Sequence, residues 1–102
     1  MENQSHEYDI VVIGCGPAGL SAAVNAKARN KSVLVAGGQL CSPKLQRAPI
    51  INNYLGFPGI TGEKLRQAFI SHAQKAQIPI NTCRVSGVIP QGNKFIVQTD
   101  TM

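Results

Sequence analysis

Tryptophan is absent from this sequence of 102 residues, and only two Tyr and three Phe are present. So few aromatic side chains cannot build a stacking platform for single-stranded nucleic acid. The net charge is nevertheless +5, from ten Lys and Arg against five Asp and Glu. Because these cations are scattered rather than gathered in one run, they indicate a solvated basic surface, and we predict no nucleic-acid partner.

Long apolar runs and a secretory signal are also missing. No run approaches the roughly 20 residues that span a bilayer, and the first residues, Met1–Glu7, are polar and acidic. We therefore expect no membrane association and a cytoplasmic location. The length allows one domain at most, with a marginal hydrophobic core.

The three cysteines, Cys15, Cys41 and Cys83, are far apart in the sequence. None forms a C-x-x-C motif, and no second Cys or His lies at the spacing of a zinc site. We expect each to be a small buried or half-buried thiol. The sequence thus predicts no redox dithiol and no catalytic residue on this chain.

What is present begins with an apolar strand that runs directly into glycines. The segment Tyr8–Ile13 is apolar and rich in β-branched residues, which is typical of a central parallel strand covered on both faces. The pattern G-x-G-x-x-G follows at residues 14–19, and small apolar residues continue as a helix to about Asn30. Ser32–Val35 predicts the next strand, so these elements form one βαβ unit.

In this context the three glycines predict a dinucleotide site. One glycine makes the turn, one allows close approach of the pyrophosphate, and one allows the helix to pack on the strand. The pyrophosphate is expected on free N–H groups at the helix N-terminus. The candidate residues are Gly14, Gly16, Pro17, Ala18 and Gly19. FAD, NAD and NADP all remain possible on this pattern alone.

Many dinucleotide folds place a carboxylate at the end of the second strand, where it binds a ribose hydroxyl. Here that position is Ala36, followed by Gly37. The missing acid argues mildly against NAD and leaves any ribose contact to the backbone or to water.

Residues 37–60 have no sustained periodicity and predict a long ordered loop. Thr61 is expected to cap a second helix, because apolar residues follow it at helical spacing. His72 lies on that apolar stripe and is expected to be a hydrogen-bonded residue at its boundary rather than a catalytic one. The stripe consists of Leu65, Ala68, Phe69, His72, Ala73 and Ala76.

The last third of the chain predicts strands only. Ile78–Cys83 is expected to be the third parallel strand. Arg84–Ile89 and Lys94–Thr99 then alternate around a turn at residues 91–93, which predicts a β-hairpin.

Two segments, "YDIVVIGCGPAGLSAA" and "NYLGFPGITG", together resemble the thioredoxin-reductase family of flavoproteins. The resemblance implies an α/β, Rossmann-like βαβ FAD-binding module with three parallel strands and a β-hairpin, incomplete relative to the family. It covers residues 9–102 as the N-terminal portion of an FAD/NAD(P)-binding domain, with residues 1–8 expected to be a flexible polar tail. Of the three nucleotides, the resemblance favours FAD.

The resemblance also implies a path for FAD along the chain. Ala36 and Gly37 would face the adenosine ribose. Arg84 and Val85 would offer backbone groups to the adenine. The residues expected near the isoalloxazine are Ser42, Lys44, Leu45 and Asn53.

The register of the isoalloxazine segment has two readings. The family has Gly-Gly-Gln-Leu near the flavin, and the same letters occur here as Gly37–Leu40, although too soon after the strand. An ungapped register places Ser42–Leu45 there instead, and we prefer it. Lys44 would then lie near the flavin pyrimidine, unless it is merely solvated. The stretch "SPKLQRAPIINNYLGFPG" also looks like a branch from anaerobic bacteria, some of which take electrons from ferredoxin.

By resemblance, the parent enzyme passes electrons from NADPH or ferredoxin through FAD to a protein disulfide of the thioredoxin kind. Family members are longer and carry C-x-x-C and an NADPH domain, so NADPH could act only through regions outside this chain. We expect the chain alone to be inactive. The alternatives are a non-catalytic nucleotide-binding module, one subunit of a split flavoprotein, or another FAD monooxygenase or dehydrogenase. The segment "NYLGFPGITG" speaks against the last of these.

The final predicted strand has no partner strand beyond the hairpin, and the late segment that completes the family's flavin site is missing from the sequence. Exposed apolar surface and an open strand edge favour association. We therefore expect a homo-oligomer, or a second polypeptide that completes the site.

Overall fold

The computed structural model describes residues 6–38 and 41–100. Its centre is a three-stranded parallel sheet in the order β1-β2-β3, made of β1 (Ile10–Ile13), β2 (Val33–Gly37) and β3 (Ile80–Thr82). The α1 helix (Pro17–Ala28) connects β1 to β2, and Ile10 pairs with Val33 in parallel register. The predicted βαβ unit and third parallel strand are confirmed.

The sheet also corrects one prediction. The apolar run that ends at Ile13 was expected to form a central strand covered on both faces, but the central strand is β2. Four of the five β2 residues are buried, whereas Ile13 in β1 is 54% exposed. The reason is that, within the described residues, β1 pairs only with β2 and so lies at the edge of the sheet.

Residues 37–60 differ from the predicted loop. β2 extends through Gly37, and the short helix α2 (Pro43–Arg47) follows. Ser42 precedes this helix in a left-handed conformation with φ of 59°. A helix of five residues is too short to show a helical periodicity in its sequence. The sequence pattern therefore did not reveal α2.

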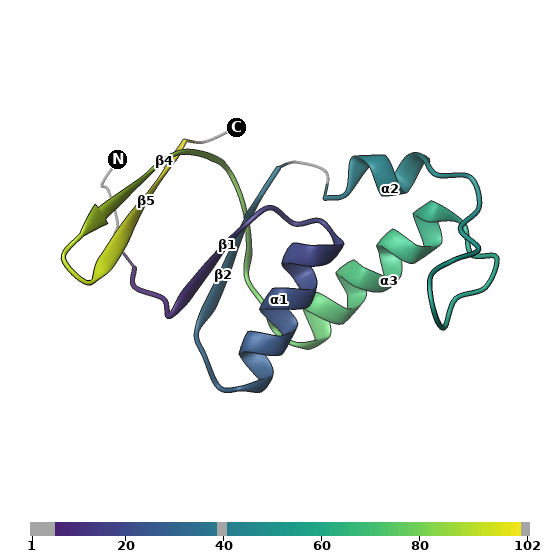
Figure 1. Ribbon diagram of the computed structural model, residues 1–102, viewed down its shortest axis with the longest axis horizontal. Coiled ribbons are helices and arrows are strands. Elements are labelled where there is room, and N and C mark those ends of the chain that lie inside the picture. Colours follow the sequence, from purple (N-terminus) through teal and green to yellow (C-terminus); the bar gives the residue numbers. More distant parts are fainter. Residues whose placement is uncertain (1–5, 39–40, 101–102) are drawn as a thin grey trace.

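The α3 helix (Gly62–Lys75) begins as predicted, because the Thr61 hydroxyl accepts a hydrogen bond from the Lys64 N–H at 3.2 Å. It packs beside α1 and α2, as Figure 1 shows. Gly62 is required at this junction, since a Cβ there would collide with the carbonyl oxygens of Leu45 and Ala48. Of the predicted stripe, Leu65 and Ala73 are buried, but His72 is exposed rather than at a boundary.

The core is small and built mainly from short side chains. Within residues 6–38 and 41–100, Leu65 and Val35 are the large side chains that are fully buried. The main cluster joins α1, β2 and the end of α3 and includes two cysteines; its members are Cys15, Leu20, Ala23, Ala26, Val33, Val35, Cys41, Ala73 and Ile78. We therefore expect hydrogen bonds and covalent bonds, in addition to apolar burial, to contribute strongly to the stability of the chain.

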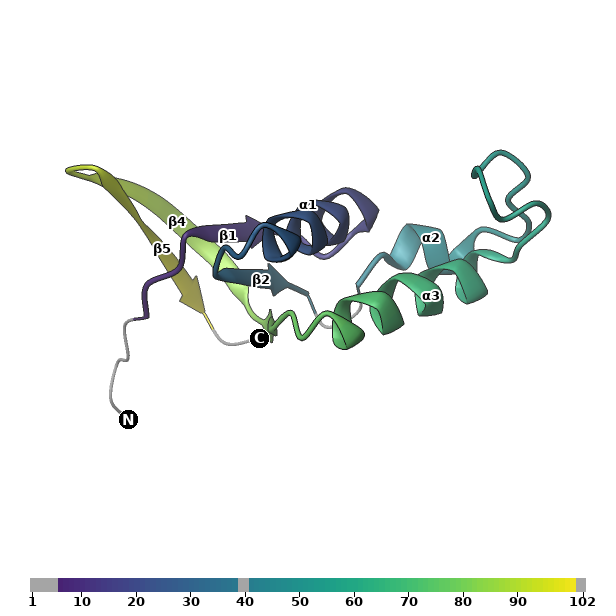
Figure 2. The same cartoon turned by 90° about the horizontal axis from the view of Figure 1, so that it is seen from below.

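The strands β4 (Arg84–Gln91) and β5 (Lys94–Asp100) form the predicted antiparallel hairpin. It projects at one end of the molecule, while the loop between α2 and α3 lies at the other end (Figures 1 and 2). The Cα radius of gyration is 15.1 Å, against about 13 Å for a compact domain of this length. The hairpin and loop account for this elongation.

Both faces of the hairpin carry exposed apolar side chains. Ile89 pairs with Ile96, and the next pair, Pro90 with Phe95, points to the opposite face. Phe95 is 69% exposed. At the other end of the molecule, Leu55 is 98% exposed.

Within the described residues, no helix is long and apolar enough to span a bilayer.

Asp9 joins the start of β1 to the start of β2. Its carboxylate accepts the Ser32 N–H at 2.9 Å, while the Ser32 hydroxyl oxygen accepts the Asp9 N–H at 2.8 Å. The backbone and hydroxyl hydrogen bonds from Ser32 hold the pKa of Asp9 below its usual value. A lowered folded-state pKa contributes stability above the unfolded pKa, which is lost as the pH falls through the folded value.

We therefore expect the free energy of unfolding to fall on acidification below about pH 4, and to fall less steeply in Asp9→Asn. Urea unfolding between pH 2.5 and 7 measures this difference. Parallel pH profiles for the two proteins would show that the Asp9–Ser32 contact carries no linked stability.

Candidate dinucleotide-binding site

The three motif glycines differ in what their surroundings demand. Gly14 has φ of +111°, which a side chain would strain. A Cβ on Gly19 would collide with the carbonyl oxygen of Gly14 and press on Val12, so this glycine allows α1 to pack on β1. Among the described residues, a Cβ on Gly16 would meet only the Ser42 hydroxyl oxygen, at 4.0 Å. Gly16 therefore faces open space that a ligand can enter.

The first turn of α1 supplies donors beside Gly16. Gly16 is the N-cap residue and provides no side-chain hydrogen bond, and Pro17 occupies the first turn. Leu20 is the first residue of α1 whose backbone N–H donates a hydrogen bond within the helix, and the Gly16 carbonyl oxygen accepts it at 2.9 Å. The N–H groups of Ala18 and Gly19 thus lie at a positive helix end without an intrahelical acceptor, which suits an anion such as a pyrophosphate.

Two shallow hollows lie along the carboxyl ends of the parallel strands. The first, of about 270 Å³, is lined by Ile13, Gly14, Ala36, Gly37, Gly38, Cys83, Arg84 and Val85. The second, of about 500 Å³, is lined by Cys15, Gly16, Pro17, Gly38, Ser42, Pro43, Lys44 and Leu45. Gly38 lines both hollows. Open α/β sheets bind ligands at this edge.

Most of the predicted site residues are brought together here. Gly14, Ala36, Gly37, Arg84 and Val85 line the first hollow, and Gly16, Pro17, Ser42, Lys44 and Leu45 line the second. Arg84 lines the first hollow, and its guanidinium pairs with Asp100 at 3.2 Å. Ala18 and Gly19 follow Gly16 in the first turn of α1.

Asn53 is not brought to either hollow. It is exposed in the loop between α2 and α3, which extends away from the sheet (Figure 2). The alternative register, Gly37–Leu40, falls partly on residues 39 and 40, which lie outside the described residues.

The cysteines overturn another prediction. Cys15 and Cys41 are both buried, as expected, but they form a disulfide across a Cα–Cα distance of 5.1 Å. Gly37 permits it, because a Cβ there would collide with the Cys15 sulfur. Cys83 is a buried free thiol. Sequence spacing could not show the pair, since the cysteines are 26 positions apart and a complete helix and strand lie between them.

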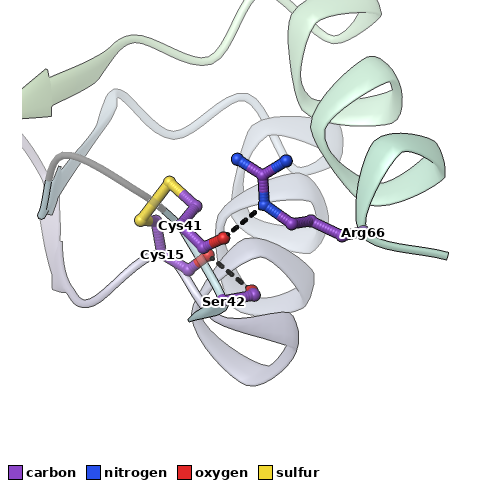
Figure 3. The surroundings of a disulfide bond; sticks show 4 residues. All are labelled: Cys15, Cys41, Ser42 and Arg66. Atoms are coloured by element: carbon purple, nitrogen blue, oxygen red, sulfur yellow. Dashed lines mark hydrogen bonds between the residues drawn. A yellow bond between two sulfur atoms is a disulfide. The ribbon is translucent and has the colours of Figure 1, made fainter. Parts of the chain in front are cut away.

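Two hydrogen bonds surround the disulfide (Figure 3). The Ser42 hydroxyl donates to the Cys15 carbonyl oxygen at 3.3 Å, and Arg66 Nε donates to the Cys41 carbonyl oxygen at 2.6 Å. Arg66 also pairs with Glu63 at 3.3 Å. Sequence reasoning missed Arg66, because nothing in the spacing of α3 indicates that one of its residues reaches Cys41.

Comparison with known proteins agrees with this geometry. Residues 9–41 match a family model described as an FAD binding domain. A solved ferredoxin-flavin thioredoxin reductase from Clostridium acetobutylicum is 46% identical, with a TM-score of 0.86 over 93% of this chain and 33% of that one. The thioredoxin reductase of T. acidophilum is 32% identical, with a TM-score of 0.85 over 91% of this chain and 31% of its own.

Among curated proteins, the thioredoxin reductase of Bacillus subtilis is 35% identical over 68 residues, which are 67% of this chain and 22% of the relative. The chain thus spans between a fifth and a third of the lengths of these relatives. The glycine loop, the parallel sheet and the family match together define an FAD-binding region of the dinucleotide-binding class. More narrowly, the chain is thioredoxin reductase-like and corresponds to the N-terminal part of these FAD-dependent oxidoreductases.

Proposed function

We propose that this chain holds FAD for an oxidoreductase that passes electrons from NADPH or ferredoxin to a protein disulfide of the thioredoxin kind. The observation that carries the proposal is the open face of Gly16, set between the free N–H groups of α1 and the wall at Ser42–Leu45. When bound, FAD would supply the redox chemistry of its isoalloxazine ring. The chain's own residues bind and orient it.

We assign each part of the site to one part of the FAD molecule. The Ala18 and Gly19 N–H groups bind the pyrophosphate, and Gly16 lets it approach. The first hollow receives adenosine, with backbone rather than carboxylate contacts because Ala36 is a buried alanine. The second hollow receives the flavin half. The identity with the ferredoxin-flavin enzyme supports ferredoxin as the donor.

FAD titration of the purified protein, followed by quenching of flavin fluorescence, tests the proposal directly. We expect saturable binding at one site and competition by ADP, which shares the pyrophosphate and adenosine contacts. Absence of saturable binding by both nucleotides would overturn the assignment.

Lys44 gives a test of the flavin position. It is exposed and lines the second hollow, where its ammonium group would lie near a ring that gains negative charge on reduction. Lys44→Met in the full-length enzyme is expected to lower the flavin reduction potential. Lys64→Met, on the exposed side of α3, is the matched control. An unchanged potential in Lys44→Met would favour the register in which residues 37–40 approach the flavin.

The exposed apolar hairpin leads to a prediction about assembly. Both of its faces carry apolar side chains in water, which favours burial against a second surface. We expect the chain to associate, as a homo-oligomer or with a second polypeptide, and to bind FAD more tightly when associated. Light scattering over a range of concentrations measures this. Replacing Phe95 and Ile96 by Thr should shift the protein toward monomer, and a wild-type monomer at every concentration would contradict self-association.

A further inference from the structure

The two walls of the second hollow belong to different parts of the framework. Cys15, Gly16 and Pro17 form one wall, between β1 and α1. Ser42–Leu45 forms the other wall, which is fixed to α3 through the Arg66–Cys41 hydrogen bond and the Gly62 N–H bond to the Ala48 carbonyl, at 3.0 Å. The spacing of the walls therefore depends on whatever connects them.

The Cys15–Cys41 disulfide connects the two walls directly, in addition to the packing of α3 beside α1. Cys15 lies in the glycine loop, and Cys41 directly precedes Ser42, so the bond joins the walls where they meet. A 3.3 Å hydrogen bond from the Ser42 hydroxyl to the Cys15 carbonyl oxygen also joins the walls here. Ser42 is also held in the left-handed region, with φ of 59°, which a serine adopts at a cost. Without the covalent link, hydrogen bonds and packing alone hold this segment against the glycine loop.

We propose that the Cys15–Cys41 pair is a reversible redox clamp that sets the FAD affinity of this chain. In the disulfide form the walls are held at the spacing that forms the hollow, and the site is preorganised. In the dithiol form the walls separate and FAD binds more weakly. The inference rests on the proposed function, because it concerns the same site.

The reductant is an external dithiol of the type that the proposed parent enzyme serves. One of its thiolates attacks a sulfur of the Cys15–Cys41 bond, which breaks as a mixed disulfide forms. The second thiol of the reductant then displaces the protein sulfur. Two electrons and two protons end on Cys15 and Cys41 as thiols, and the reductant leaves as a disulfide. The reverse exchange restores the clamp.

The position of Cys15 couples FAD binding to reduction of the disulfide. Because Cys15 lines the hollow, a dinucleotide in the hollow covers the route by which a thiolate reaches the bond. Binding linkage also requires reciprocity: if the disulfide raises FAD affinity, FAD must stabilise the disulfide by the same factor. In cytosolic proteins, disulfides are usually transient, catalytic or redox-sensing, and the cytoplasm is the location that we predict.

The experiment measures FAD affinity in both redox states of the purified protein, with thiol counting by mass spectrometry and far-UV circular dichroism on the same samples. We expect reduction to raise the FAD dissociation constant about tenfold, within the usual range of coupling between sites. The dissociation constant for ADP, which lacks the flavin half, should rise less than threefold. Circular dichroism separates loosening of the site from unfolding.

Variants and a second readout make the test specific. Cys41→Ser and Cys41→Ala should both have the weak affinity and lose the redox response, whereas Cys83→Ala should keep the ratio between the two states. In dithiothreitol redox buffers, saturating FAD should make the pair about tenfold harder to reduce, which is a potential about 30 mV more negative.

The outcomes separate the two proposals. Equal FAD affinity in both redox states, with the fold intact, overturns the clamp and leaves the proposed function standing. A potential that FAD does not move also overturns the clamp, by reciprocity. If neither redox state binds FAD or ADP, the proposed function fails and the clamp fails with it.

Discussion

Gly16→Val is expected to weaken FAD binding about 100-fold while the fold survives, a loss of about 2.8 kcal/mol in binding free energy. Gly16 has φ of −77° and ψ of −177°, which valine adopts without strain. Of the residues that the structure describes, only Ser42 comes near a Cβ there, with its hydroxyl oxygen at 4.0 Å. The two added methyl groups therefore enter the space assigned to the pyrophosphate and meet little of the protein.

Fluorescence titration with FAD and ADP, beside thermal unfolding, measures both parts of this prediction. Ala22→Val is the matched control, because it adds the same side chain at an exposed position of α1 and should leave affinity unchanged. Gly19→Ala should instead lower the stability of the fold, because its Cβ would collide with the Gly14 carbonyl oxygen. Unchanged affinity in Gly16→Val would remove Gly16 from the site.

Reduction of the Cys15–Cys41 disulfide should lower the free energy of unfolding by about 3.5 kcal/mol, from the entropy of closing a loop of this size. The cysteines are 26 positions apart in the sequence. The core offers little compensation, because most of its buried side chains are small. For a domain of this length the loss corresponds to a fall in the midpoint of thermal unfolding of about 15 °C or more.

Urea and thermal unfolding, with and without a non-thiol reductant, test this expectation. Cys41→Ala should match the reduced wild type and no longer respond to the reductant. Cys83→Ala should still respond, because its remaining cysteines form the bond. If the reductant leaves the wild-type midpoint unchanged, the disulfide does not contribute to stability in solution.

The parts of the fold that the sequence predicts well are those with a local cause. The glycine pattern between two apolar runs predicts the βαβ unit, Thr61 predicts the start of α3, and the turn at residues 91–93 predicts the hairpin. The site residues around Gly16 follow from the same pattern, because the motif itself orders the loop.

The parts that the sequence could not predict depend on contacts between distant residues. Whether the run ending at Ile13 is central or at an edge depends on which strands flank it, and its composition cannot show this. The Cys15–Cys41 bond requires that β1 and the residues after β2 end at the same edge of the sheet. Asn53 was assigned to the flavin by resemblance and lines neither hollow, and the loop that carries it is held by contacts such as the Ile51–Ile60 bridge and the Tyr54–Phe69 ring pair. Its role toward the flavin stays a prediction.

The turn of the β4–β5 hairpin offers a place to attach a probe. Gly92 and Asn93 form the tip and are exposed, and both views place this tip at the end of the molecule opposite α2 (Figures 1 and 2). Exposed tips of small and polar residues tolerate insertions. A short labelling peptide inserted between these residues would carry a fluorophore without adding a cysteine. Its rotational diffusion would then report association of the hairpin from a position remote from the dinucleotide site.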